Sequence, residues 1–154
     1  MQSIRRTILK FTSGVGALAA LSATSIVRVG EVVAAQWNKS GFESKAMEDA
    51  IKSLGAANMI DSKDIVITAP DIAENGAVVP IAVVSKVPNT QSISIIAEKN
   101  PFPLAATFDI AGSDPYVSTR VKMGQTSNVR VIVKADGKYY TAVKEVKVTV
   151  GGCG

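Results

Sequence analysis

Residues 36–62 follow a helical pattern of apolar and polar positions. Five apolar residues recur at spacings of three and four, which places them on one face of a helix; they are Ala46, Met47, Ala50, Ile51 and Leu54. Gly55 follows as a typical helix stop. The pattern predicts an N-terminal helical segment over residues 36–62, and Trp37 and Phe42, which precede the helix, are expected to dock it.

From residue 63 onward, the pattern changes to short β-branched runs separated by turn residues. It predicts seven strands, over residues 65–68, 77–84, 92–96, 104–110, 116–123, 129–133 and 139–150. Asn75-Gly76 and Asp136-Gly137 are turn signals between them, and Pro80 suggests an edge or a bulge because it lacks an N–H group. No long helical pattern separates successive strands, so a parallel sheet with crossover helices is not expected. The predicted fold is mainly β, an immunoglobulin-like antiparallel β-sandwich over residues 63–150.

Two of these strands have a defined apolar face. One face of residues 116–123 is expected to be buried, and it carries Val117, Thr119, Val121 and Met123. The last strand carries Val143, Val146, Val148 and Val150, with a change of phase between Val143 and Val146 that suggests a bulge. This strand leads directly into Gly151, so a rigid strand is expected to aim the residues that follow it.

Residues 1–35 have the features of a twin-arginine export signal. Arg5 and Arg6 form the arginine pair, a mildly apolar run follows, and Ala34 and Ala35 supply a cleavage site. Cleavage there would leave residues 36–154, the length of one ordinary domain. The expected location is the periplasm, with no membrane contact after cleavage. Because this route exports folded proteins and no cofactor motif is visible, a partner subunit is the expected reason for its use.

The net charge of +4 belongs largely to the predicted signal. Residues 1–35 hold Arg5, Arg6, Lys10 and Arg28 against Glu31, so the remainder has 13 basic and 12 acidic residues. A charge of +1 without a basic run gives no indication of nucleic-acid binding.

The candidate chemistry lies in residues 151–154, Gly-Gly-Cys-Gly. Cys153 is the single cysteine of the chain, which has no histidine, and glycines on both sides leave it without local cover. Fully extended, four residues reach roughly 13 Å at about 3.3 Å each. The pattern predicts a thiol on a flexible arm formed with Gly151, Gly152 and Gly154, although a chain end can also be glycine-rich without a role. A metal site is not expected, because no second cysteine or histidine exists to complete it.

Several basic residues are further candidates. Lys144 and Lys147 near the tail would favour the thiolate of Cys153, although activation should be modest without a histidine base. Arg120, Lys122 and Arg130 are expected on neighbouring strands, as a solvated basic face or as a contact for an anionic group or a partner. The Pro80 edge and the Arg120/Arg130 face are the candidate partner surfaces.

The sequence resembles the SoxY family, the sulfur-carrier subunits of bacterial thiosulfate oxidation. The resemblance lies in the twin-arginine leader and in four stretches, which are Asn75–Pro80, Asn100–Leu104, the region from Ser118–Val121 to Asp136–Tyr140, and the tail Val150–Gly154. The tail is the most specific of them. The family usually has two glycines after the cysteine, whereas only Gly154 follows Cys153 here, so the arm is expected to be one residue shorter.

The resemblance implies a covalent carrier without catalytic activity or cofactor of its own. Cys153 would be the site of sulfur attachment, and Gly151, Gly152 and Gly154 would form the arm. The implied partners are a SoxZ-like subunit exported with the chain, a SoxAX-like haem protein that couples thiosulfate to the cysteine, a SoxB-like hydrolase that removes sulfate, and a SoxCD-like enzyme where one is present.

Two other functions are open from the residues alone. A structural β-sandwich could use Cys153 for an intermolecular disulfide, since a single exported cysteine either pairs with another chain or stays reactive. A thiol enzyme is the weakest reading, because the chain has neither a histidine nor a second thiol.

Overall fold

The computed structural model describes residues 37–149. The predicted signal peptide (1–35) and carrier arm (151–154) lie outside this range. Two helices come first, α2 (Lys39–Glu43) and α3 (Met47–Ser53). The strands follow, with one 3-10 helix η1 (Gly76–Val78), and are β1 (Met59–Asp61), β2 (Ile65–Thr68), β3 (Ile72–Ala73), β4 (Val79–Ser85), β5 (Thr90–Ala97), β6 (Leu104–Asp109), β7 (Tyr116–Val121), β8 (Ser127–Ala135) and β9 (Lys138–Val148).

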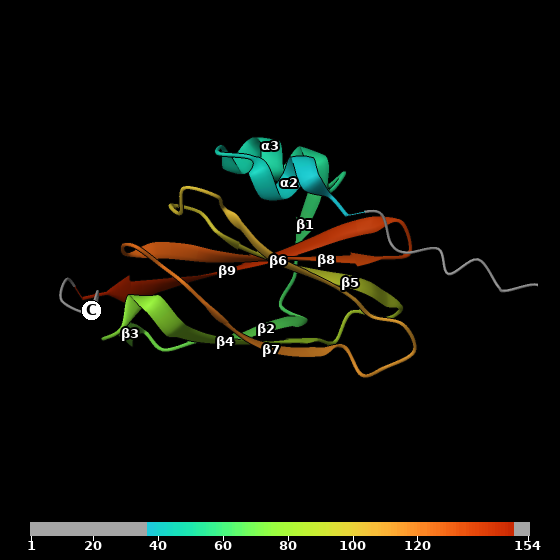
Figure 1. The fold of residues 1–154 in the computed structure, drawn as a ribbon. Helices are drawn as coiled ribbons and strands as arrows, with labels where there is room; N and C mark the ends of the chain where they lie inside the picture. The colour runs from blue at the N-terminus through green and yellow to red at the C-terminus, as the bar shows by residue number, and fades with distance from the viewer. Residues whose placement is uncertain (1–36, 150–154) are drawn as a thin grey trace, which may run out of the picture. The chain divides into compact units, whose positions relative to one another are not determined.

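The strands form the two layers of a β-sandwich (Figure 1). The larger sheet has the order β1-β9-β8-β5-β6, with β3 also paired to β9, and the smaller sheet has the order β2-β4-β7. The mainly β, antiparallel sandwich expected from the sequence is therefore confirmed, and each of the seven predicted strands is present. The strands β1 and β3 were not predicted, and both run parallel to β9.

The helical segment differs from its prediction. The described part of this segment, residues 37–62, contains two short helices rather than one. Met59–Asp61 is the strand β1, which pairs with the edge of β9. The prediction was wrong at this end because Met59 and Ile60 complete a sheet edge, where backbone pairing outweighs local helix propensity. The stop at Gly55 is confirmed, since this glycine has φ +74° and follows α3.

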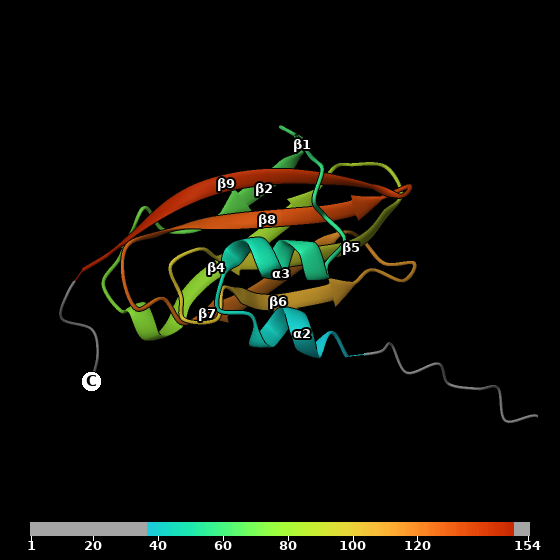
Figure 2. The same cartoon turned by 90° about the horizontal axis from the view of Figure 1, so that it is seen from above.

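Residues from both helices cover one face of the larger sheet (Figure 2). A second hydrophobic cluster lies beneath them, consisting of Ala50, Ile51, Ala56, Ile96, Leu104 and Ile132. Phe42 packs against this cluster, whereas Trp37 is 70% exposed. The docking role expected of Phe42 is therefore confirmed.

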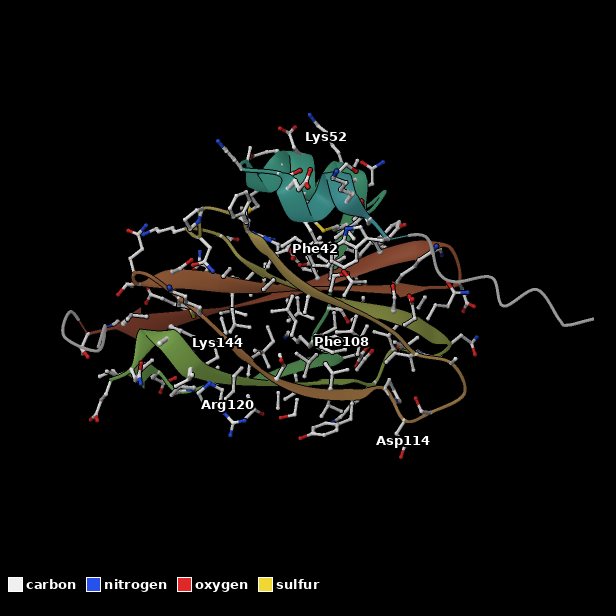
Figure 3. The ribbon with its side chains drawn as sticks, in the orientation of Figure 1. Phe42, Lys52, Phe108, Asp114, Arg120 and Lys144 are labelled. Carbon is white, nitrogen blue, oxygen red and sulfur yellow. The ribbon has the colours of Figure 1, made fainter. Side chains whose placement is uncertain are left out.

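The main core lies between the two sheets. Alternate residues of β8 show how the larger sheet serves both clusters, since Val131 and Val133 face the smaller sheet and Ile132 faces the helices. The buried face expected for residues 116–123 is confirmed, because Val117, Val121 and Met123 are buried. Figure 3 shows the ring of Phe108 between the sheets.

The strand β9 begins in a tight turn and continues without a break. Asp136 and Gly137 have φ +49° and +72°, the two positive values that a type I′ turn requires, so the predicted hairpin is confirmed. The pairing of β8 with β9 has no irregularity along its length. The predicted bulge is therefore wrong, because Val143 and Val146 belong to opposite faces of a regular strand.

The position of Pro80 corrects another expectation. The strand β4 lies in the middle of the smaller sheet, so it is not an edge strand. However, β2 pairs only with residues 82–85 of β4, whereas Pro80 lies opposite Arg120 of β7 alone. A residue without an N–H group is therefore placed where β4 has a strand on one side only.

Candidate functional site

The predicted site residues Gly151, Gly152, Cys153 and Gly154 lie outside the described residues. The structure instead describes the place from which this segment leaves the domain, the end of β9 at Val148 and Thr149. The contacts around these two residues form the base of the tail, and they come from three separate parts of the chain.

The first contact is the strand β3, which runs beside the end of β9. Ile72 lies opposite Lys147, and Ala73 lies opposite Val148. The N–H of Lys147 donates to the carbonyl of Asp71 at 3.0 Å, and the N–H of Thr149 donates to the carbonyl of Ala73 at 3.1 Å. These bonds hold the backbone of β9 up to the last described residue.

The second contact is Thr126, on the opposite side of β9. The ladder between β8 and β9 ends at the pair of Ser127 and Val146, so Val148 has no strand partner on that side. The N–H of Val148 instead donates to Thr126 Oγ1 at 3.0 Å. A side-chain hydroxyl thus replaces the missing backbone acceptor, which keeps a partly buried N–H group satisfied.

The third contact is the turn that contains Gly76. Its carbonyl accepts a hydrogen bond from the N–H of Met123 at 2.7 Å. A Cβ atom at residue 76 would overlap the carbonyl oxygen of Met123 and lie 2.8 Å from Val148 Cγ1. The Asn75-Gly76 turn signal is therefore explained by a close approach, because only glycine lets this loop pack against the end of β9.

Charged groups surround the base of the tail. Lys144 Nζ lies 3.0 Å from Asp71 Oδ1, and their side chains are 31% and 89% exposed. Lys147 is exposed and makes no ion pair within residues 37–149. An effect of either lysine on the thiol of Cys153 stays a prediction, although Lys144 already has an acidic partner.

The expected basic face of Arg120, Lys122 and Arg130 is formed only in part. Arg120 and Lys122 are exposed and line the same hollow, whereas Arg130 lies apart from them. Arg130 belongs to β8 in the larger sheet, where its Nη2 lies 2.8 Å from Glu98 Oε1 with both side chains mostly buried. Arg120 belongs to β7 in the smaller sheet. The two arginines were expected on neighbouring strands, but the sequence gives no sign of which sheet each strand joins.

No group of three or more metal-ligating side chains occurs among residues 37–149. No helix in this range is long and apolar enough to cross a membrane. The contacts of Asp71, Ala73 and Thr126 with the end of β9 were not predicted, because the sequence carries no periodic signal for them. Gly76 was singled out in the sequence as part of the Asn75-Gly76 turn signal.

Comparisons with known proteins identify the family of the chain. Residues 51–153 match the family model described as sulfur oxidation protein SoxY. The structure of the sulfur carrier protein SoxY from Chlorobium limicola f thiosulfatophilum is 42% identical over 66% of this chain and 96% of that chain, with a TM-score of 0.59.

Two structures of a superoxide reductase (neelaredoxin) from Ignicoccus hospitalis are more distant. They are 19% and 18% identical with TM-scores of 0.49, and cover 55% and 64% of this chain and 79% and 87% of theirs. No curated protein matches the chain.

Proposed function

The chain belongs to the SoxY family of sulfur oxidation proteins, and we propose that it carries sulfur intermediates covalently on the thiol of Cys153. The observation that carries this proposal is the base of the tail. The backbone of β9 is held by Thr126 at Val148 on one side and by Ala73 at Thr149 on the other, and the four residues 151–154 contain three glycines and the one cysteine. A fixed base followed by a segment of small residues suits delivery of one sulfur atom to several enzymes.

The loading step is an oxidative coupling. The thiolate sulfur of Cys153 forms an S–S bond with the outer sulfur of thiosulfate, and the thiol proton passes to water. The coupling releases two electrons, and a haem-containing SoxAX-like partner would supply the oxidant that accepts them. The product is an S-thiosulfonate attached to Cys153.

The unloading step is a hydrolysis. Water attacks the sulfonate sulfur, the bond from that sulfur to the sulfane sulfur breaks, and sulfate leaves with a proton. A persulfide stays on Cys153. In this scheme a SoxB-like hydrolase catalyses the step, a SoxCD-like enzyme oxidises the sulfane sulfur where it is present, and the carrier is a substrate rather than a catalyst.

The glycines define what the carrier contributes. An extended segment of four residues spans about 13 Å. Because Cys153 carries its one side chain, the segment can enter a channel too narrow for larger residues. Ordering each residue in such a channel costs about 1–2 kcal/mol of backbone entropy, which favours release over tight binding. We further propose export to the periplasm through Arg5 and Arg6, together with a SoxZ-like partner subunit.

Intact mass spectrometry tests the proposal. The chain is expressed with its own leader in cells grown on thiosulfate and is then purified. The Cys153→Ser variant is prepared in the same way as a matched control. We expect the mass of a chain that begins at Gln36. We also expect sulfur-containing adducts on it, which dithiothreitol removes and which the variant lacks.

Two outcomes would contradict this function. Adducts of the same mass on Cys153→Ser would show that sulfur is held elsewhere. A disulfide-linked homodimer as the only resting form, with no adduct after growth on thiosulfate, would instead support a structural role for Cys153.

A further inference from the structure

The two sheets present different outer faces. The outer face of the larger sheet packs against α2 and α3, whereas no other described element covers the outer face of the smaller sheet (Figure 1). The side chains of that uncovered face come from alternate residues of three strands.

The uncovered face is almost free of charge. Its residues lie in three rows across the strands, which are Val66–Val84–Tyr116, Thr68–Ala82–Ser118 and Pro80–Arg120. A solvent-facing sheet usually alternates buried apolar with exposed polar residues, and here the exposed set contains a single charged side chain. Val66 is 40% exposed and Tyr116 is 56% exposed. Exposed apolar groups that gather on one face mark an interaction surface.

The middle of this face is a shallow hollow that another protein layer can approach closely. A hollow of about 330 Å³ lies around Ala82, and its lining consists of Thr68, Ala69, Pro70, Pro80, Ile81, Ala82 and Ser118. Small side chains at the centre allow a second layer to pack at the usual distance of about 10 Å between sheets. This shape fits the surface of a folded subunit with apolar side chains.

Arg120 lies at the corner of the face. Figure 3 shows its side chain on the outer side of the smaller sheet, where it makes no ion pair or hydrogen bond with residues 37–149. It also borders a second hollow of about 240 Å³ that includes Lys122 and Phe102, and the ring of Phe102 is 51% exposed. Arginine and aromatic side chains are enriched among the residues that dominate binding, and a free guanidinium calls for a carboxylate on the partner.

The size and charge of the face indicate which kind of partner binds there. Three strands about 4.8 Å apart and about 20 Å long give a footprint of roughly 300 Å², below the roughly 800 Å² per partner of a stable interface. The contact must therefore extend around β7 onto Phe102, which excludes a short peptide. A twofold dimer would place the same patch on both sides, and this patch has no acidic residue to pair with Arg120. A different chain is favoured over a second copy.

The position of the face agrees with the carrier role. Its last row, Pro80–Arg120, adjoins the pair of Val79 and Val121, and the Gly76–Met123 contact at the base of the tail follows directly. A subunit on this face would lie beside the departure point of the tail.

We propose that the outer face of the smaller sheet, with Arg120 and Phe102 at its margin, is the docking surface for a separate protein subunit. That subunit presents uncharged apolar side chains to Ala82 and Ser118 and a carboxylate to Arg120. The inference rests on the proposed function, which requires a SoxZ-like partner, and it specifies the surface that such a partner uses.

Binding of the purified SoxZ-like subunit encoded in the same genome tests the surface. The dissociation constant is measured by calorimetry for the mature chain, for Ser118→Arg and for Val143→Arg. Val143 is the matched control, because it is an outward strand residue, 44% exposed, on the other sheet. We expect Ser118→Arg to weaken binding at least 30-fold and Val143→Arg by less than threefold, with both variants folded by circular dichroism.

A second pair of variants tests the charge. Arg120→Ala should weaken binding about tenfold and Arg120→Lys by less. Hydrogen exchange of the wild-type complex should show protection at residues 80–84 and 116–120. Because this readout requires no substitution, it would decide the question even if Ser118→Arg failed to fold.

Three results would overturn the proposal. The first is a dissociation constant of Ser118→Arg within threefold of the wild-type value. The second is the absence of binding by the wild-type chain, and the third is a wild-type homodimer that the Ser118→Arg substitution dissociates. Sulfur adducts on Cys153 are measured separately. Loss of adducts with an intact effect of Ser118→Arg would defeat the carrier function alone, and normal adducts with no effect of Ser118→Arg would defeat the surface alone.

Discussion

The two ends of β9 are fixed in different ways. At its start, Asp136 and Gly137 form a turn whose backbone angles match the twist of the strands that it joins. At its end, the backbone of Val148 and Thr149 bonds to Thr126 and Ala73, which lie far away in the chain. The start is specified by two neighbouring residues, whereas the end requires that much of the domain is already folded.

This difference has an energetic consequence. A primed turn stabilises the hairpin through the conformational preference of its own residues. The base of the tail depends on several contacts that must form together, and each is modest alone because an intramolecular hydrogen bond contributes about 1 kcal/mol net. Substitutions at the two ends should therefore differ in the loss of unfolding free energy that they cause and in how far along β9 their effect extends.

Gly76→Ala should have the largest effect, because it opposes the close packing at the end of β9. The new Cβ would overlap the carbonyl oxygen of Met123, which is backbone and cannot rotate away. We expect a loss of about 2–3 kcal/mol in the free energy of unfolding, measured by urea denaturation. Amide exchange at Thr149 should also become faster.

Gly124→Ala is the matched control for that variant. A Cβ atom at Gly124 has no atom within 4 Å, so we expect a change of less than about 0.5 kcal/mol. Equal losses in the two variants would show that the contact with Met123 and Val148 does not determine the effect.

Gly137→Ala should have a smaller and more local effect at the start of β9. No atom lies within 4 Å of the added Cβ, so the penalty comes only from φ +72°. A left-handed conformation costs an L residue about 1–2 kcal/mol, and Gly137→Asn should recover part of that loss. Thermal unfolding measures both. Faster exchange at Thr149 in Gly137→Ala would contradict the independence of the two ends.

Lys144→Ala should have the smallest effect. Its ion pair with Asp71 is largely exposed, and such pairs contribute about 0.2–1 kcal/mol and are screened by salt. Chemical denaturation in urea at low and at high sodium chloride should show a loss below about 1 kcal/mol that shrinks in salt. A loss that is larger and independent of salt would assign the role of Lys144 to packing.

Much of the sandwich could be predicted from the sequence, because its signals are local. Short β-branched runs between turn residues identified seven strands, and Asp136-Gly137 identified the last hairpin. The same local reasoning failed over residues 59–61, which were assigned to the helical segment although they follow the stop at Gly55 and pair with β9. The unpaired edge of β9 selected the strand, and that edge is not visible in the local sequence.

The surroundings of the tail could not be predicted for a related reason. The strand β3 has only two residues, which is too short for any period, and its partner lies far along the chain. Arg130 was expected to be exposed with Arg120, but Glu98, in the turn that follows the neighbouring strand β5, pairs with it. Cross-strand neighbours depend on strand order and register, which a single sequence does not define.

The pairing of β3 with β9 also determines when the base of the tail can form. The hydrogen bond between Ala73 and Thr149 cannot form until Thr149, the last of the described residues, has been synthesised. Contacts between such distant segments also carry an entropic cost of loop closure, which must be overcome before the contact stabilises the fold. The hairpin at Asp136-Gly137 can close earlier, because its partners are adjacent. An intact base is therefore a late event in folding, and a chain that presents its tail from that base has already completed the sandwich behind it.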